Sequence, residues 1–222
     1  MRRKGIKKKT VFGLVMLLQM LSMSAFSQII ILEPTEKYIG ISQGINNSFV
    51  LFYPNLKQNL FFPGYTGGIS YRYITEKHWG LQVELKYSQR GWSEKDNTYT
   101  RRIDYVELPF LTHFYFGNTH RAILNVGPKI GYLLNDRTLK NTSSEPNAEQ
   151  HKSIYFPFDY GGTLGIGYNL HTKNSGVYEV ELRGYYALSD IFANTKRDFF
   201  QMSNTLNISL NFVLYLQLTG NK

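Results

Sequence analysis

The side chains that could carry out nucleophilic or acid–base chemistry in this sequence are serines, histidines and carboxylates, because the chain contains no cysteine. A serine nucleophile needs a histidine and a carboxylate within hydrogen-bond reach. Four of the five histidines fall in segments predicted below to be turns or loops; the five are His78, His113, His120, His151 and His171. Only His113 falls on a predicted strand, where a structural hydrogen bond accounts for it. The pattern predicts no catalytic residues, and a lipid-acting enzyme is kept as an alternative.

Other kinds of site are equally poorly represented. Without cysteine the chain has neither disulfides nor thiolate metal ligands. The glycines at positions 161, 162, 165 and 167 miss the spacing of a dinucleotide-binding loop and lie inside a predicted strand. No phosphate-binding loop or metal-ligand spacing is present, so the sequence predicts no cofactor and no metal.

The positive charge of the chain is concentrated at its beginning. Six of the 25 basic residues lie between Arg2 and Lys9, and without residues 1–27 the balance is 19 basic against 16 acidic residues. A mildly basic body without a dense Lys/Arg stripe gives no electrostatic footprint for nucleic acid. We therefore expect no nucleic-acid partner.

The first segment has the features of an export signal. Residues 2–9 are basic, Val11 to Met23 are almost entirely apolar, and Ser24-Ala25-Phe26-Ser27 supplies small residues before Gln28. This order predicts a cleaved signal peptide over residues 1–27. The alternative is a membrane anchor, but the apolar run is shorter than the about 20 residues that a transmembrane helix needs. The remaining domain, residues 28–222, contains no apolar run longer than Val11 to Met23.

Apolar and polar residues alternate along most of this domain. From Trp79 to Arg90, apolar residues such as Leu81 and Val83 occupy one parity and polar residues the other, and residues 206–218 repeat the pattern. A period of two predicts β-strands. Six further segments fit the same template, at about 38–52, 64–75, 103–116, 121–134, 158–170 and 177–189.

The connections between these eight segments alternate in length. The short ones are residues 75–78, 117–120 and 171–176, and the long ones are 53–63, 91–101, 135–157 and 190–203. Short turns at one end and long loops at the other are typical of outer-membrane barrels, whose long loops face outside the cell. An even number of strands closes the sheet without an edge. The predicted fold is all-β: a closed, eight-stranded, antiparallel up-and-down transmembrane β-barrel.

The polar parity of the strands predicts what fills the barrel. It carries five charges of each sign, which matches a narrow interior neutralised by compensating pairs. We predict a structural charge network, joined by His113, made of Arg72, Glu84, Lys86, Arg90, Glu107, Lys129, Asp159, Glu179, Glu181 and Arg183. The same parity carries glycines that leave room in a crowded lumen, at positions 68, 127, 131, 161, 165 and 167.

Aromatic residues on the apolar parity gather near the ends of the strands. Beside the short turns lie Tyr73, Trp79, Phe116, Tyr168 and Tyr178, and toward the long loops lie Tyr65, Tyr87, Tyr132, Tyr160 and Tyr186. Two such bands are the interfacial aromatic girdles of a membrane barrel. They favour an apolar face in contact with outer-membrane lipid over the alternative, a soluble lipocalin-like barrel with the apolar face inside.

Four strand patterns are distinctive in this domain: Gly67 to Tyr71, the Trp79 to Gly91 strand ending in Ser88-Gln89-Arg90-Gly91, Tyr105 to Pro109, and Asn125 to Pro128 leading to Gly131-Tyr132. They resemble the PorT-like family of outer-membrane β-barrel proteins of Bacteroidota. The resemblance covers most of residues 28–222 and implies the barrel fold. The family name comes from a member linked to protein secretion, so the resemblance implies a secretion role. The chain departs from many outer-membrane barrels by ending Leu218-Thr219-Gly220-Asn221-Lys222.

The expected function is a non-enzymatic structural or accessory component of the Gram-negative outer membrane. An eight-stranded barrel has an interior that side chains fill, which argues against a general pore. We expect the outer-membrane assembly machinery to recognise the strand around Phe212 and Tyr215. Envelope or secretion proteins are expected to bind through loops 135–157 and 190–203. The second loop carries Phe192, Phe199 and Phe200, which pack over the barrel mouth in one interpretation and meet a partner in the other.

Overall fold

The computed structural model describes residues 35–60, 62–95, 97–142, 149–172, 176–194 and 198–219. The predicted signal peptide, residues 1–27, lies outside these residues. Within the described ranges no helix has the length and apolar character needed to cross a membrane.

Eight strands follow one another in the part of the chain that the structure describes, and a short 3-10 helix, η2 (Glu149–His151), lies between the fifth and the sixth. Their alternating, β-branched and aromatic residues favour extended backbone. The strands are β1 (Glu36–Tyr53), β2 (Pro63–Glu76), β3 (Trp79–Ser93), β4 (Tyr99–Gly117), β5 (His120–Asn141), β6 (Phe158–Thr172), β7 (Gly176–Asp190) and β8 (Met202–Thr219). The predicted number, order and type of elements are confirmed.

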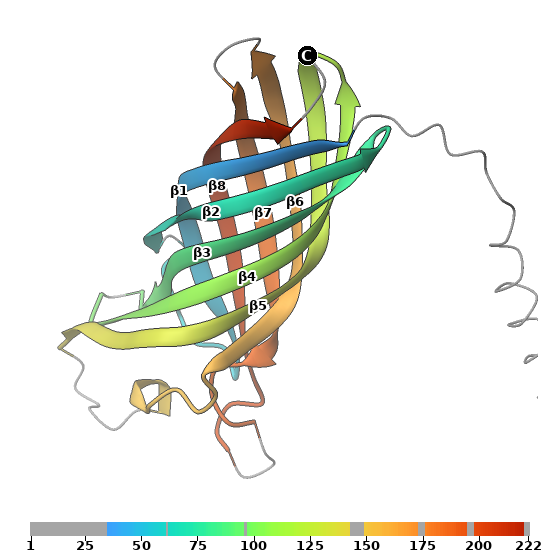
Figure 1. Ribbon diagram of the computed structural model, residues 1–222. Coiled ribbons are helices and arrows are strands. Elements are labelled where there is room, and N and C mark those ends of the chain that lie inside the picture. The colour runs from blue at the N-terminus through green and yellow to red at the C-terminus, as the bar shows by residue number, and fades with distance from the viewer. Residues whose placement is uncertain are drawn as a thin grey trace, which may run out of the picture. The chain divides into compact units, whose positions relative to one another are not determined.

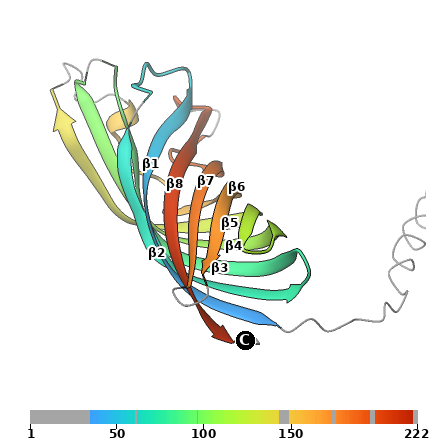
Figure 2. The ribbon, with the colours of Figure 1, turned by 90° about the horizontal axis from the view of Figure 1, so that it is seen from above.

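The strands form one closed barrel in chain order (Figure 1). Every neighbouring pair is antiparallel, and β1 completes the ring by pairing with β8 from Lys37–Thr219 to Tyr53–Met202. Figure 2 shows β1 lying beside β8 at this closing seam. A closed ring satisfies backbone hydrogen bonds between strands, which is the condition for spanning a membrane with strands.

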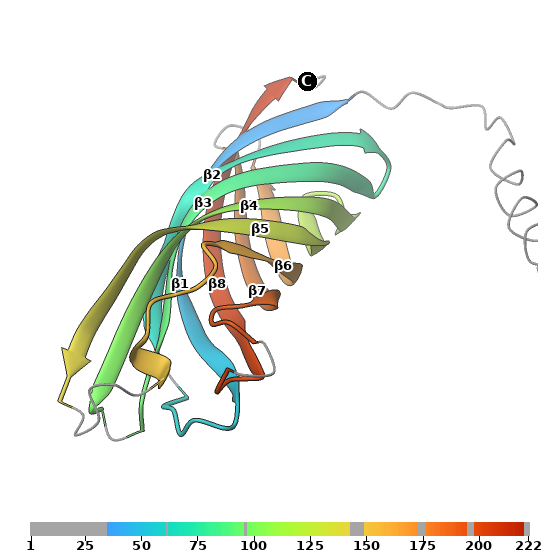
Figure 3. The same ribbon diagram turned by 90° about the horizontal axis from the view of Figure 1, so that it is seen from below.

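The connections alternate in length as predicted, although the strands at the loop end are longer than predicted. Figure 3 shows the long connections gathered at one end of the barrel. β4 begins at Tyr99 rather than residue 103, and β5 continues to Asn141 rather than residue 134. Register shifts at Thr100/Arg101 and Asp104/Tyr105 interrupt the simple alternation in this part of the β4–β5 ladder, which is why periodicity stopped short of the true strand ends.

The apolar parity of every strand faces outward. Leu81 and Leu182 are 54% and 49% exposed, whereas the intervening positions Gln82 and Arg183 are buried. The inverted, lipocalin-like arrangement is therefore wrong for this chain. A continuous apolar outer wall around a polar interior is the arrangement of a barrel surrounded by hydrocarbon.

Two apolar clusters of described residues lie inside the barrel, one toward each end, and only the packing of the 190–203 aromatic residues over the mouth had been among the expectations. The loop-side cluster, called the mouth cluster, consists of Val50, Phe52, Trp92, Tyr99, Ile103, Tyr105, Ile191, Phe192 and Phe200. The turn-side cluster, called the base cluster, consists of Tyr38, Ile74, Val177, Val213 and Tyr215. Trp92 and Tyr215 are both fully buried. The charged interior is thus closed by apolar side chains at both ends.

Candidate functional site

All eleven residues predicted for the lumen network lie on the inward parity of their strands and are buried. They come from β2, β3, β4, β5, β6 and β7, so the network ties together strands that are distant in sequence. The register decides the pairing, and the charges divide into two groups along the barrel.

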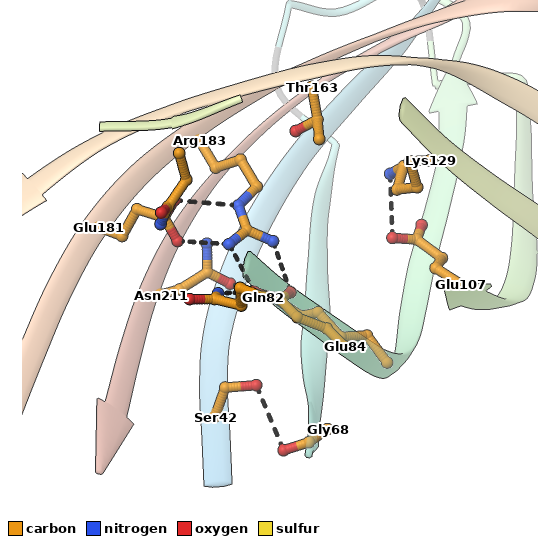
Figure 4. Close-up of polar contacts among 12 residues, drawn as sticks. Ser42, Gly68, Gln82, Glu84, Glu107, Lys129, Thr163, Glu181, Arg183 and Asn211 are labelled. Atoms are coloured by element: carbon orange, nitrogen blue, oxygen red, sulfur yellow. Dashed lines mark hydrogen bonds and ion pairs between the residues drawn. The ribbon is translucent and has the colours of Figure 1, made fainter. Parts of the chain in front are cut away.

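The first group is centred on Arg183 of β7 (Figure 4). Its guanidinium donates to both carboxylate oxygens of Glu84 at 2.6 and 2.8 Å. It also donates to Glu181 at 2.6 Å. Charge-assisted bonds of this kind are the strong ones in proteins. One arginine thereby holds two buried carboxylates and joins β3 to β7 across the lumen.

Arg72 of β2 extends this group toward the base cluster. It donates to both oxygens of Glu179 at 2.9 and 2.8 Å and to the hydroxyl of Tyr215 at 3.0 Å. Its Nε donates to Gln82 at 2.6 Å, and the amide of Gln82 donates in turn to Glu84. Gln82, which the sequence did not single out, therefore joins the two arginines into one network.

Lys86 balances the charge of the first group. Arg72 and Arg183 face three glutamates, namely Glu84, Glu179 and Glu181. Lys86 lies two residues beyond Glu84 on the same inward face, with its Nζ 2.7 Å from Asn211 Oδ1. Three cations and three carboxylates then make this part of the lumen neutral, which limits the cost of burying charge.

The second group lies toward the mouth cluster and is centred on Arg90 of β3. Arg90 donates to Asp159 at 2.5 Å and also pairs with Glu107, whose other oxygen accepts from Lys129 at 2.9 Å. Tyr185 faces both cations, with its ring centroid 4.7 Å from Arg90 Cζ and 3.4 Å from Lys129 Nζ. Two cations, two carboxylates and a shared ring form a second neutral group.

His113 belongs to the first group rather than to a catalytic set. Its Nδ1 donates to Asn125 Oδ1 at 2.7 Å, and Asn125 Nδ2 donates to Glu181 at 2.8 Å. Within the described parts of the chain no hydrogen bond joins a serine hydroxyl to a histidine ring. The described residues also contain no cluster of three or more His, Asp or Glu side chains able to hold a metal. The geometry supports charge neutralisation.

Glycines make room for the network at two close approaches. A Cβ on Gly165 would lie 1.9 Å from Glu181 Oε1, and a Cβ on Gly40 would lie 2.5 Å from the ring of Tyr215. Gly165 was among the predicted lumen glycines, whereas Gly40 was not. Both positions are glycine because a long side chain from another strand occupies the space above them.

The ten aromatic residues predicted for the girdles all point outward. Eight of them are exposed, from 41% for Trp79 and Tyr186 to 58% for Phe116. Tyr73 and Tyr87 are half-buried. Their outward direction is what a role at the bilayer surface requires.

Two phenylalanines of the loop 190–203 pack over the mouth of the barrel. Phe192 and Phe200 are buried in the mouth cluster, where Phe200 lies 4.8 Å from Phe52 between ring centroids. Phe199 remains 56% exposed. Of the two interpretations of this loop, packing thus holds for Phe192 and Phe200, and Phe199 is left on the surface.

The long loop between β5 and β6 is more closely attached than its polar composition suggested. His151 stacks on Tyr99 at a centroid distance of 3.9 Å, and Ile154 packs against the mouth cluster. Arg101 pairs with Asp136 and donates to the carbonyl of Lys152 at 2.6 Å.

His171, predicted to be in a turn, instead lies in β6 and contacts Tyr38 edge-on at a centroid distance of 6.0 Å.

Inward parity was the signal that could have revealed the end clusters. Tyr215 and Val213 share the parity of Asn211, and Tyr105 and Ile103 share that of Glu107. Because these inward residues are apolar, the pattern of charges did not include them in the predicted lumen.

Comparison with solved structures finds barrels of the outer membrane. OprG of Pseudomonas aeruginosa is 8% identical, with a TM-score of 0.49 over 85% of this chain and 98% of that chain. Ail of Yersinia pestis, crystallised with the heparin analogue sucrose octasulfate, is 13% identical, with a TM-score of 0.42 over 82% and 99%. The outer membrane enzyme PagL is 10% identical, with a TM-score of 0.45 over 80% and 98%. Similarity this low carries no information about function.

Sequence comparison identifies the family of the chain. No curated protein matches it significantly. The family model of the outer membrane protein beta-barrel domain, however, matches residues 26–193. This range includes seven of the eight strands and every residue of the charged interior. The chain therefore belongs to the outer membrane protein beta-barrel domain family.

Proposed function

We propose that this protein is a non-enzymatic, non-conducting barrel of the Gram-negative outer membrane that serves as an accessory component of an envelope complex. The observation that carries the proposal is the closed interior. Two neutral charge groups fill the middle of the lumen, and the mouth and base clusters close its ends.

This filled interior argues against a role in the passage of solutes through the barrel. A pore needs a continuous water-filled path, whereas Arg90, Tyr99 and Trp92 near the mouth and Tyr215 near the base are each at most 1% exposed. The interior of an eight-stranded barrel is normally filled by side chains. The loops are then the part of the molecule through which it acts on other molecules.

An accessory role fits the loop-end surface. The mouth cluster holds the β7–β8 loop in place through Phe192 and Phe200, while Phe199 of the same loop is exposed. Tyr155, in the β5–β6 loop, is 72% exposed. Exposed aromatic residues on a fixed scaffold are suited to protein contacts. The PorT-like strand patterns favour a secretion complex as the partner.

Conductance measurement tests the closed barrel. The purified protein in a planar bilayer is expected to give no ion channels under applied voltage. Arg90→Ala with Trp92→Ala, which removes side chains from the mouth end of the lumen, serves as the opened comparison. Regular, voltage-independent channels from the unmodified protein would contradict the proposal.

Photo-crosslinking in intact cells tests the accessory role. A photo-reactive amino acid at Phe199 is expected to yield a reproducible protein adduct, identified by mass spectrometry. The matched control is the same amino acid at Phe116, which is 58% exposed but lies beside a short turn. Adducts at neither position, together with a lipid A profile altered by deletion of the gene, would favour the enzyme alternative.

A further inference from the structure

At the loop end, the ladder between β6 and β7 stops before the two strands do. β6 begins at Phe158 and β7 continues to Asp190, but their ladder stops at the Gly161–Ala187 pair. Beyond that pair, the hydroxyl of Ser189 accepts from the backbone N–H of Tyr160 at 3.2 Å and donates to Asp159 Oδ1 at 2.7 Å. A side chain rather than a backbone ladder therefore links the two strands at the rim.

A cleft of about 580 Å³ lies at this rim. Tyr160 and Leu188 line it from the two strands, Tyr155 and Phe156 from the β5–β6 loop, Asp190 from the end of β7, and Asn194 from the β7–β8 loop. The backbone N–H of Tyr155 donates to the Ile191 carbonyl at 3.1 Å, which holds the loop beside the cleft. The volume lies within the range typical of small-molecule sites, roughly 300–1,000 Å³.

The cleft changes from apolar to polar over a short distance. Leu188 is 62% exposed on the outer wall, and only two residues later Asp190 presents a carboxylate. That carboxylate is held in place by the backbone N–H of Ser203 at 2.5 Å and by Asn194 Nδ2 at 2.8 Å. None of the described residues that line the cleft is a lysine or arginine.

We propose that this cleft binds one amphiphile with a sugar headgroup. Its hydrocarbon chain lies along Leu188 and Tyr160, where the outer wall is apolar. Its hydroxyls donate to the carboxylate of Asp190, and the sugar ring packs on the exposed face of Tyr155. A phosphocholine headgroup offers no hydrogen-bond donor to Asp190, and an anionic headgroup is repelled by the Asp190 carboxylate. The proposal rests on the barrel lying in a membrane and is independent of the accessory role.

Methyl NMR in lipid nanodiscs tests the proposal. Nanodiscs of phosphatidylcholine are doped with increasing monogalactosyl diacylglycerol of the same chain length, and the methyl signals of Leu188 and Ala193, both lining residues, are followed. We expect saturable shifts at these two residues and none at Leu164, an exposed outer-wall residue that does not line the cleft. Doping with phosphatidylglycerol is expected to leave all three unchanged.

Two variants, each removing an exposed tyrosine, locate the binding. Tyr155→Ala is expected to weaken the galactolipid titration about fivefold, because an aromatic packing contact is lost. Tyr53→Ala removes a tyrosine that is 57% exposed on β1 and outside the cleft, and is expected to have no effect. Absence of saturable shifts with galactolipid, shifts with phosphatidylglycerol alone, or equal effects of the two variants would each overturn the proposal.

Discussion

Leu182 and Arg183 are neighbours on β7 that experience opposite surroundings. Leu182 points outward and is 49% exposed, whereas Arg183 points inward, is buried and binds two carboxylates. On the apolar face of β7, the stability of a side chain depends only on being surrounded by hydrocarbon. On the charged face, it depends on specific partners. The outer wall should therefore accept any apolar side chain of suitable size, whereas the lumen requires particular residues.

Removal of Arg183 should have the largest effect on stability. Arg183→Met leaves Glu84 and Glu181 buried without their guanidinium partner. Breaking a buried pair from one side costs about 4 kcal/mol. Denaturant unfolding in lipid vesicles measures the change. Leu182→Met on the outer face is the matched control, and equal losses from both variants would mean that the lumen charges are not a connected network.

Loss of a ring from the mouth cluster should have the next largest effect on stability. Phe200→Ala removes a buried ring that contacts Phe52 and Phe192, which is expected to cost about 3 kcal/mol. Phe199→Ala removes its exposed neighbour and is expected to change stability by less than about 0.5 kcal/mol. Thermal unfolding followed by gel mobility compares the two. Similar midpoints would show that the loop does not seal the mouth.

A charge placed on the outer wall should be less costly than a charge lost from the lumen. Leu182→Arg introduces a guanidinium halfway along β7 on the lipid side, where the expected cost is about 2.5 kcal/mol. The same unfolding measurement in vesicles applies. Lys152→Arg, an exposed loop position that already carries a charge, is the control. A neutral result for Leu182→Arg would indicate that water rather than hydrocarbon bathes this face.

The smallest expected difference in stability is between alanine substitutions at two glycines of β6. Gly165→Ala places a methyl group against the carboxylate of Glu181 and is expected to cost about 2 kcal/mol. Gly162→Ala points outward and meets no atom within 4 Å, so its effect should stay within about 0.5 kcal/mol. Because both changes share a strand and a residue type, a difference between them isolates lumen crowding from strand propensity.

The sequence predicted the fold because every strand repeats one rule. A period of two fixes which parity faces outward, and alternating connection lengths fix the up-and-down order, so Leu81, Leu108 and Leu210 are all on the outer face. The loop-end extensions of β4 and β5 escaped this rule because bulges near Arg101 and Tyr105 shift the alternation.

The lumen residues followed from the same parity, but their pairing did not. Arg72 and Glu179 are 107 positions apart and meet only because the registers of the ladders between β2 and β7 bring them together. The amides that connect the charges, Gln82 and Asn125, carry no charge pattern in the sequence. The cleft beside Tyr160 lies where the β6–β7 ladder ends, and alternation does not reveal where a ladder ends.

Spin-label accessibility in lipid vesicles tests the central claim, that hydrocarbon surrounds the apolar face. The natural chain has no cysteine, so single labels can be attached at Leu81→Cys, Leu164→Cys and Leu182→Cys, all outward positions more than 45% exposed. We expect each label to be relaxed strongly by oxygen, which concentrates in hydrocarbon, and weakly by a water-soluble nickel chelate. Stronger relaxation by the nickel chelate at these three positions would contradict the account.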